Sequence, residues 1–436
     1  MSELKIPNEF STKQPKNKKT WQPKQIISKR QMLGLFLGFL FIPIFIYIIL
    51  PIMARRHFCN YLKLPQEVFL SEPKHINLIK QTEKNNGYVI NLNGYEFKIP
   101  ENFTPTSIYE NKVDFSNSSR SNARLIHIYT DLDDKKFKFS SFGLSKWFMP
   151  SNPASYMQLI LHATWHPIRL MYKSNFYANE GLNTRVYETD FENYHRGFVY
   201  ALPGQNGYTS RIYNLYGAGF VEFSIKDTVK PPTLAEWVKS ASYIKTIKSI
   251  KDVPDSKEKS SYKLDKLIEQ AQLRKKETDI LRICLNEYFR TKSPEWIIPI
   301  AYIMKNREYY IDLNDLYKEH VNKFPKNSKE KALWDSIMEE AVSKIIKIEI
   351  DPTNRVRELN IYCRNLTQLE IEDIQVEISV VNYLGKETSF IASLVEESGK
   401  ILPMLEKSIH IKPPEDINLS NAQKISCKVV KIDFLR

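Results

Sequence analysis

The chain has 436 residues, 42% of them hydrophobic and 12% aromatic, which is enough apolar material for two or three packed domains and excludes a largely disordered chain. Its formal net charge of +13 is unevenly spread, because residues 1–31 hold eight basic residues against two acidic ones. No zinc-finger spacing, Gly-rich basic loop or RNP-like aromatic cluster follows this tail, so the sequence predicts no nucleic-acid binding.

An uncharged apolar run follows the basic tail. Residues 1–31 are rich in Lys, Asn, Gln and Pro without periodicity and predict a disordered tail. Residues 32–54 are 23 residues without a charge. As a helix they rise about 35 Å, which crosses a hydrocarbon core of about 30 Å. The sequence therefore predicts a transmembrane helix over 32–54, with membrane lipid as its partner.

The run is predicted to stay in the protein as a signal anchor. It is longer than the apolar region of a cleavable signal peptide, and no small-residue cleavage site follows it. Lipidation of Cys59 is disfavoured because the residues before it are large or charged. Seven basic residues between Lys13 and Arg30 face four in residues 55–74. The positive-inside rule then places the N-terminus in the cytoplasm and the later domains outside it.

Residues 60–248 predict an α+β domain. "YVINLNGYEFKI" reads as a hairpin, because Asn93-Gly94 supplies the positive φ angles of a two-residue turn between alternating apolar residues. The expected elements in chain order are this hairpin over 88–99, a second hairpin joining 124–130 to 135–141, an apolar helix over 153–172, strands at 197–202, 208–216 and 219–225, and a closing helix with a capping box of Thr233 and Glu236. The "NGYEFKIPENF" stretch and the helix after the meander resemble, over residues 85–248, the Mog1/PsbP type of α/β sandwich. This resemblance rests on pattern and brings no functional residues with it.

Residues 249–262 contain Pro, Ser and mixed charges with few apolar residues, and predict a linker. Residues 263–345 are expected to be helical, with helices near 277–291, 294–307 and 312–323 and a last helix capped at Asn327 or Ser328. No 34-residue repeat can be aligned, so the prediction is a small helical bundle.

Residues 346–436 change to a period of two and predict a small β-sandwich. Asn365-Leu366-Thr367, the stretch "IEDIQVEISVVNYLGKE" and Gly385 in the turn after it resemble the FxLYD-like family of extracytoplasmic β-sandwich domains. Asn382-Tyr383 stands where that family has Tyr-Asp, which is a departure from its pattern. The resemblance implies an adhesion or assembly module and not an enzyme.

Two histidines in "LHATWHP" are the metal candidates. His162 and His166 lie four residues apart, and on one helix this spacing places both side chains on the same face. Zinc proteases with this spacing need Glu after the first His, where this chain has Ala163, and no third ligand follows from the spacing. Packing or capping near Pro167 is the favoured role, so the sequence predicts no metal and no cofactor.

Other catalytic patterns are weak. Asp131, Asp133 and Asp134 in "TDLDD" resemble a metal-binding D-x-D, but they are better explained as a hairpin loop, since the doubly wound βα units of sugar transferases are missing. G-x-S-x-G, H-E-x-x-H, P-loop and G-x-G-x-x-G motifs are absent. Cys363 and Cys427 are both expected to point into the sandwich core, as two buried thiols or as a disulfide.

Taken together, these patterns predict a membrane-anchored multidomain α+β protein with a single transmembrane helix, an α+β domain, a helical bundle and a C-terminal β-sandwich. The predicted function is that of a single-pass cell-envelope protein whose extracytoplasmic domains bind other envelope proteins or glycans and support assembly, without catalysis. The alternative is an anchored metal-dependent hydrolase or transferase whose site in residues 60–248 uses His162, His166 or His195 with an acidic partner. A third arrangement, a scaffold that faces the cytoplasm, requires the opposite topology.

Overall fold

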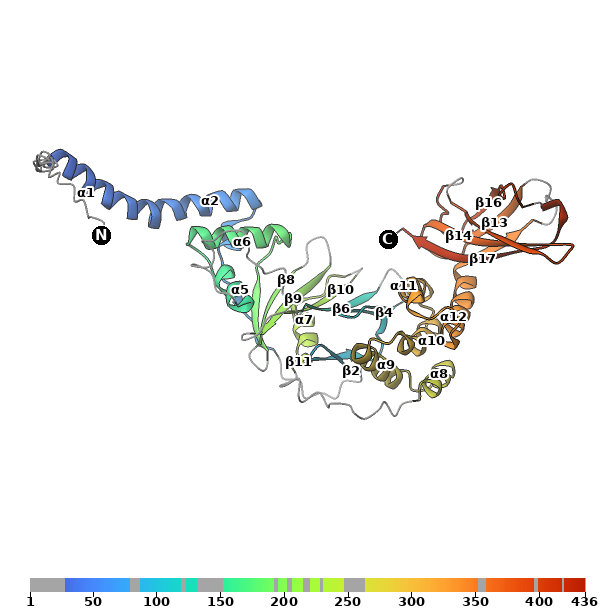
Figure 1. The fold of residues 1–436 in the computed structure, drawn as a ribbon. Coiled ribbons are helices and arrows are strands. Elements are labelled where there is room, and N and C mark those ends of the chain that lie inside the picture. The colour runs from blue at the N-terminus through green and yellow to red at the C-terminus, as the bar shows by residue number, and fades with distance from the viewer. Residues whose placement is uncertain are drawn as a thin grey trace, which may run out of the picture.

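The computed structural model describes most of the chain after the basic tail, and the described ranges are 28–78, 87–118, 123–131, 152–191, 195–201, 206–214, 220–227, 230–246, 263–351, 358–395, 399–417 and 419–435. They form a mixed α/β structure with several sheets and one long apolar helix at the N-terminal end (Figure 1). The predicted tail up to residue 27, the strand over 135–141, Asp133, Asp134 and the linker over 249–262 lie outside the described residues.

The N-terminal helix is longer than the predicted 32–54. It consists of α1 (Lys29–Ile44), a π-helical turn η1 (Phe45–Ile49) and α2 (Leu50–Leu62), and it ends where Lys63 adopts a left-handed conformation with φ 54°. Pro51 has no N–H to donate to the carbonyl four residues earlier, and its ring crowds that carbonyl. The π-helical turn lies just before this proline, where such widening accommodates the missing hydrogen bond.

The central sheet has eight strands in the order β1-β7-β8-β9-β10-β6-β5-β4. The predicted meander is confirmed, because β8, β9 and β10 pair in sequence as antiparallel neighbours. Only the short β1 joins its neighbour β7 in parallel. The strands are β1 (Lys74–His75), β4 (Thr104–Ile108), β5 (Lys112–Ser116), β6 (Arg124–Asp131), β7 (Tyr187–Phe191), β8 (His195–Ala201), β9 (Gly207–Asn214) and β10 (Phe220–Asp227).

The predicted first hairpin is also confirmed. β2 (Gly87–Leu92) and β3 (Tyr95–Pro100) pair across Asn93 and Gly94, whose φ angles of 50° and 87° are those that this two-residue turn requires. β11 (Lys245–Thr246) completes a three-stranded sheet on the far side of β3. The closing helix α7 (Leu234–Ala241) begins with the predicted capping box of Thr233 and Glu236.

The single helix expected over 153–172 is wrong. The chain forms two helices, α5 (Pro153–Leu161) and α6 (Pro167–Asn179), with a corner between them. Pro167 disfavours helical angles at the residue before it, and His166 is accordingly extended, with φ −71° and ψ 119°. A short helix α3 (Gln66–Phe69) connects the N-terminal helix to this layer.

The later helices share one hydrophobic core with the sheets, because the same buried cluster runs from Tyr88 of β2 through Trp237 of α7 to Trp334 of α12. The amide of Asn286 joins α9 to the open edge of β2, donating to the carbonyl of Val89 (3.2 Å) and accepting from the N–H of Asn91 (2.7 Å). These helical elements are α8 (Leu264–Gln272), α9 (Glu277–Thr291), η3 (Pro294–Trp296), α10 (Ile297–Asn306), α11 (Tyr310–His320), η4 (Val321–Lys323) and α12 (Lys329–Ile345), the last capped by Ser328.

The C-terminal region contains two three-stranded antiparallel sheets that share a second buried cluster, which is the arrangement of a β-sandwich. α12 passes directly into its first strand. One sheet has the order β12-β13-β16 and the other β15-β14-β17, with β12 (Ile346–Ile350), β13 (Leu359–Asn365), β14 (Ile371–Asn382), β15 (Glu387–Ser393), β16 (Glu406–Ile411), the turn η5 (Leu419–Asn421) and β17 (Ala422–Phe434).

The two sandwich cysteines are free thiols. Cys363 is fully buried, as expected, whereas Cys427 is only half-buried. Burial raises the pKa of Cys363 to about 12 and that of Cys427 to about 11. Both thiols are therefore protonated at neutral pH and poorly reactive.

Candidate functional site

The most distinctive site of the described chain is the junction between the N-terminal helix and the α+β region. α2 and α6 run side by side (Figure 1), and a separate buried cluster lies beneath them. Cys59 of α2, Phe69 of α3, Leu161 of α5 and Tyr177 of α6 belong to this cluster. The long helix is therefore fixed to the following domain by packing and not only by the chain connection.

A buried lysine is the centre of the junction. The side chain of Lys173 is fully buried, and its ammonium donates to the carbonyls of Leu161 (2.6 Å), Ser71 (3.1 Å) and Ala163 (3.2 Å). These three acceptors match the three N–H groups of an ammonium ion. Since Leu161 is the last residue of α5, the positive charge also lies at the negative end of that helix.

The electrostatics of Lys173 are those of a buried charge. Burial lowers its pKa to about 7, and the nearby Glu72 carboxylate and Cys59 thiol act in the opposite direction. The ring of Phe69 lies 5.7 Å from the ammonium nitrogen and adds a cation–π contact. Lys173 thus joins the segment after the N-terminal helix to both helices of the α5–α6 corner.

A tryptophan at the corner contacts the apolar helix directly. The indole Nε1 of Trp165 donates to the carbonyl of Tyr47 at 2.9 Å, and the guanidinium of Arg55 lies 5.2 Å from the indole ring centroid. Tyr47 lies four residues before Pro51, which has no N–H to donate to its carbonyl. The corner therefore supplies a hydrogen bond that the proline withholds.

The metal candidates do not share a helical face. His162 caps the end of α5 and His166 the start of α6, so the expected i, i+4 pair does not exist. His162 instead contacts two carboxylates, with Nε2 3.0 Å from Glu188 and Nδ1 3.9 Å from Glu72. Burial and the neighbouring Arg169 lower the pKa of His166.

The third histidine considered from sequence, His195, is buried on β8 and packs edge-on against the ring of Tyr95 at 5.3 Å. It does not join the other two. Within the described ranges, no group of three His, Cys, Asp or Glu side chains is placed to hold a metal ion. His162 has, in Glu188, the acidic partner that the enzyme alternative required of one of the three histidines.

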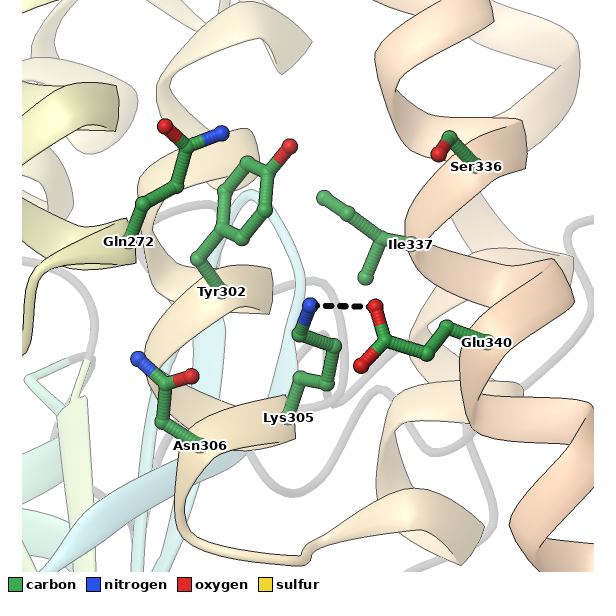
Figure 2. Close-up of a pocket in the computed structure, with 7 residues that line it drawn as sticks. All are labelled: Gln272, Tyr302, Lys305, Asn306, Ser336, Ile337 and Glu340. Atoms are coloured by element: carbon green, nitrogen blue, oxygen red, sulfur yellow. Dashed lines mark hydrogen bonds and ion pairs between the residues drawn. The ribbon is translucent and has the colours of Figure 1, made fainter.

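A polar hollow of about 250 Å³ lies between α10 and α12 (Figure 2). Lys305 and Glu340 pair across it at 2.7 Å, and Asn306 donates to the carbonyl of Ala271 at 2.8 Å. Its two charged groups thus neutralise one another. The hollow is lined by Gln272, Tyr302, Lys305, Asn306, Ser336, Ile337 and Glu340.

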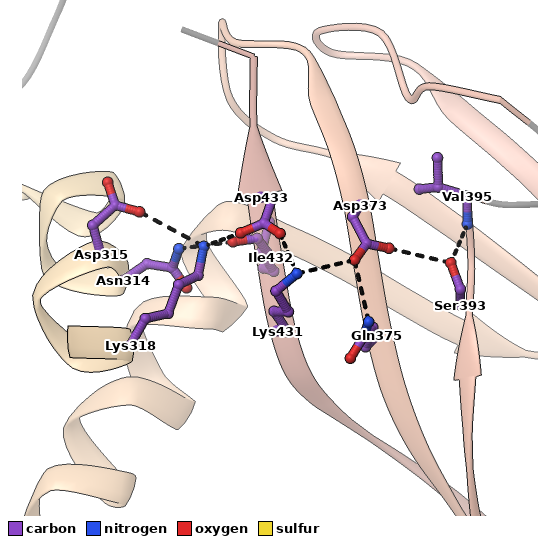
Figure 3. Close-up of polar contacts among 10 residues, drawn as sticks. All are labelled: Asn314, Asp315, Lys318, Asp373, Gln375, Ser393, Val395, Lys431, Ile432 and Asp433. Atoms are coloured by element: carbon purple, nitrogen blue, oxygen red, sulfur yellow. Dashed lines mark hydrogen bonds and ion pairs between the residues drawn. The ribbon is translucent and has the colours of Figure 1, made fainter. Parts of the chain in front are cut away.

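A polar network joins α11 to the outer strand of the sandwich (Figure 3). The buried amide of Asn314 donates to the carbonyl of Ile432 at 3.0 Å. Beside it Lys318 pairs with Asp433, which also pairs with Lys431, and Lys431 reaches Asp373 on β14 at 3.3 Å. These contacts hold the sandwich against the helical region.

We expect the buried member of this network to contribute more stability than the charged one. Asn314→Leu should lower the free energy of unfolding by about 1–3 kcal/mol, because it leaves a buried carbonyl without a donor. Lys318→Met should cost at most about 1 kcal/mol, because that ion pair is partly exposed to solvent. Thermal unfolding of the two full-length variants measures the difference, and an equal or reversed order would contradict this assignment.

Sequence reasoning missed Lys173, Trp165 and the hollow. A lysine within the apolar helix "IRLMYKSNFY" was the available signal for the first. The other two depend on segments that are distant in the sequence and that only the fold brings together.

No protein-family model and no curated protein matches the chain. Among solved structures, the Pseudomonas fluorescens alkylpurine DNA glycosylase AlkC bound to DNA containing an abasic site analog is 12% identical, over 38% of this chain and 59% of that chain, with a TM-score of 0.15. A TM-score this low carries no information on fold or activity.

Proposed function

We propose that this chain is a single-pass membrane-anchored protein of the cell envelope, whose domains after Leu62 lie outside the cytoplasm and bind other envelope proteins or glycans without catalysis. The observation that carries the proposal is the helix Met32–Leu62. It has 31 residues and a mean hydropathy of 2.7 over its most apolar window, and none of that window is buried against the rest of the chain.

The exposure of this helix argues against a role as a core helix. Large apolar side chains face outward all around it, including Phe36 (64% exposed), Phe39 (75%) and Ile46 (46%). Exposed apolar area costs about 25 cal/mol per Å² in water, so a surface of this extent needs an apolar environment. A lipid bilayer supplies it over about 30 Å, or about 20 residues, of such a helix.

The sandwich offers the surface best suited to a partner. Tyr383 (71% exposed) and Leu384 (92%) form the tip of the turn between β14 and β15. Leu402, Met404 and Leu405 are exposed at the other end of β14, where Ile401 pairs with Ile371. An exposed aromatic and an exposed aliphatic side chain side by side at a turn are suited to a protein–protein contact. The resemblance to FxLYD-like domains supports an adhesion or assembly role for this region.

The test uses two variants of the full-length protein in intact cells, each with one cysteine added to the native four. Leu384→Cys should react with a membrane-impermeant maleimide without permeabilisation, whereas Lys13→Cys should react only after it. The unmutated chain gives the background from its native thiols. Labelling of position 13 alone in intact cells would contradict the proposed topology.

The same cysteine tests the binding role. A photoactivatable crosslinker on Leu384→Cys should form discrete adducts with envelope components. Glu415→Cys, at an exposed polar position of the same domain, is the matched control and should form none. Identical adduct patterns at the two positions would contradict a specific contact at the β14–β15 turn.

A further inference from the structure

We infer that the α5–α6 corner docks into the outer boundary between lipid headgroups and acyl chains, beside the spanning helix. This surface comprises Trp165, Ile168 and Met171, and its proposed occupant is the bilayer itself. The inference rests on the proposed anchor, but it adds a second membrane contact that determines how the extracytoplasmic region sits on the lipid surface.

The corner meets the N-terminal helix near the outer end of its apolar stretch. Trp165 donates to the carbonyl of Tyr47 and stacks with Arg55, so its ring lies alongside the segment between these two residues. Met32–Pro51 is a stretch of 20 residues. At 1.5 Å per residue it rises about 30 Å, which equals the thickness of the hydrocarbon core. A bilayer centred on this stretch has its outer boundary at the level of Trp165.

The hydrogen bond of Trp165 compensates for a proline in the N-terminal helix. Pro51 removes the usual donor for the carbonyl of Tyr47, and water is scarce at that depth. Proline is tolerated in spanning helices where a neighbouring group satisfies the freed carbonyl. The indole N–H of Trp165 does so here, at 2.9 Å. Tryptophan is also the residue type enriched at membrane boundaries, because its ring is apolar and its N–H is polar.

Large apolar side chains are exposed on α6 and just before it. Trp165, which precedes the helix, is 42% exposed, and Ile168 and Met171, three residues apart on one face of α6, are 37% and 40% exposed. Their opposite side carries the buried Leu170 and Lys173 of the junction. The exposed face thus starts at Trp165, which contacts Tyr47 and Arg55 of the N-terminal helix.

Basic side chains lie at the same level. Arg55 and Arg56 follow the uncharged run 32–54 directly, and Arg169 lies in the first turn of α6. Guanidinium groups at this level face the phosphates of lipid headgroups and are attracted to anionic lipid. An apolar face next to a cationic rim fits a bilayer surface better than it fits a second protein.

The test measures depth on full-length protein reconstituted in phosphatidylcholine–phosphatidylglycerol vesicles. Nitroxide labels are placed at Ile168→Cys and at Asn175→Cys, an exposed position farther along the same helix. Oxygen concentrates in the acyl region and a nickel chelate in water. We expect the label at 168 to collide more with oxygen than with nickel, and the label at 175 to show the reverse order.

Two results would overturn the inference. The label at 168 would behave like that at 175 if the corner stood in water, and it would be shielded from both reagents if a protein covered it. As a second readout, lipids brominated near the headgroup quench the fluorescence of tryptophan at that depth. Trp165→Phe should remove most of this quenching, whereas Trp334→Phe, at a buried position, should leave it unchanged. A protein that sediments with the vesicles and gives the aqueous result at 168 refutes this inference alone, whereas a chain that does not associate with vesicles refutes the anchor as well.

Discussion

Replacing Lys173 with methionine is expected to lower the free energy of unfolding by about 3 kcal/mol at neutral pH. Three carbonyls, those of Leu161, Ser71 and Ala163, lose their donor, and each buried unpaired acceptor costs about 1–3 kcal/mol. The loss is smaller than the sum because methionine also removes the cost of burying a charge. We expect the effect to appear as a lower melting temperature of the full-length protein in detergent.

The pH dependence of the free energy of unfolding shows whether Lys173 causes this loss of stability. In the folded protein the pKa of Lys173 is lowered to about 7, whereas an unfolded lysine has a pKa of about 10.4. Between these values the unfolded chain binds a proton that the folded chain does not, so this group makes stability rise with pH by about 1.4 kcal/mol per unit. The cost of the buried charge is fully present below about pH 7.

Lys173→Met should lack this contribution, so its disadvantage is expected to grow between about pH 7 and pH 10. Lys239→Met, which removes an exposed lysine on α7, is the matched control and should follow the wild-type curve. Parallel curves of unfolding free energy against pH for wild type and Lys173→Met would show that folding does not lower the pKa of Lys173.

The second large effect is expected at Trp334. Its side chain is fully buried, stacks with Tyr317 at a centroid distance of 5.9 Å and lies 6.3 Å from the ring of Phe324. Trp334→Ala should therefore cost about 3–5 kcal/mol. Trp334→Phe should cost much less, because it keeps an aromatic ring and removes an indole N–H that has no hydrogen-bond partner among the described residues.

Hydrogen exchange shows which parts of the structure lose stability in Trp334→Ala. The buried cluster is continuous from α12 to the β2–β3 hairpin, so Trp334→Ala should reduce amide protection in β2 as well as in the later helices. Leu273→Ala, at a side chain that is 55% exposed, should leave both regions unchanged. Unaltered protection in β2 of Trp334→Ala would contradict a shared core.

Local signals predicted the elements well where the chemistry is local. The Asn93-Gly94 turn, the capping box of Thr233 and Glu236 and the alternation in the C-terminal strands each depend on residues a few positions apart. The helix break at His166 was also local, since proline disfavours helical angles at the residue before it, but the apolar pattern on both sides outweighed it.

The junction depends on long-range packing, and its chemistry follows from the fold. Lys173 would be an unusual core residue in any single helix, and only the meeting of α3, α5 and α6 provides its three carbonyl acceptors. Trp165 likewise meets Tyr47 across 118 positions of sequence. The continuity of the helical core with the sheet was missed for the same reason, because an amphipathic stripe shows that a face is buried and not what covers it.

Alkaline extraction of membranes from cells that make the full-length chain tests most directly whether the N-terminal helix spans the bilayer. A helix of this length and hydropathy is expected to keep the intact protein, with its N-terminus uncleaved, in the membrane pellet at high pH and to release it only into detergent. Recovery of the intact chain in the detergent-free supernatant would contradict the account.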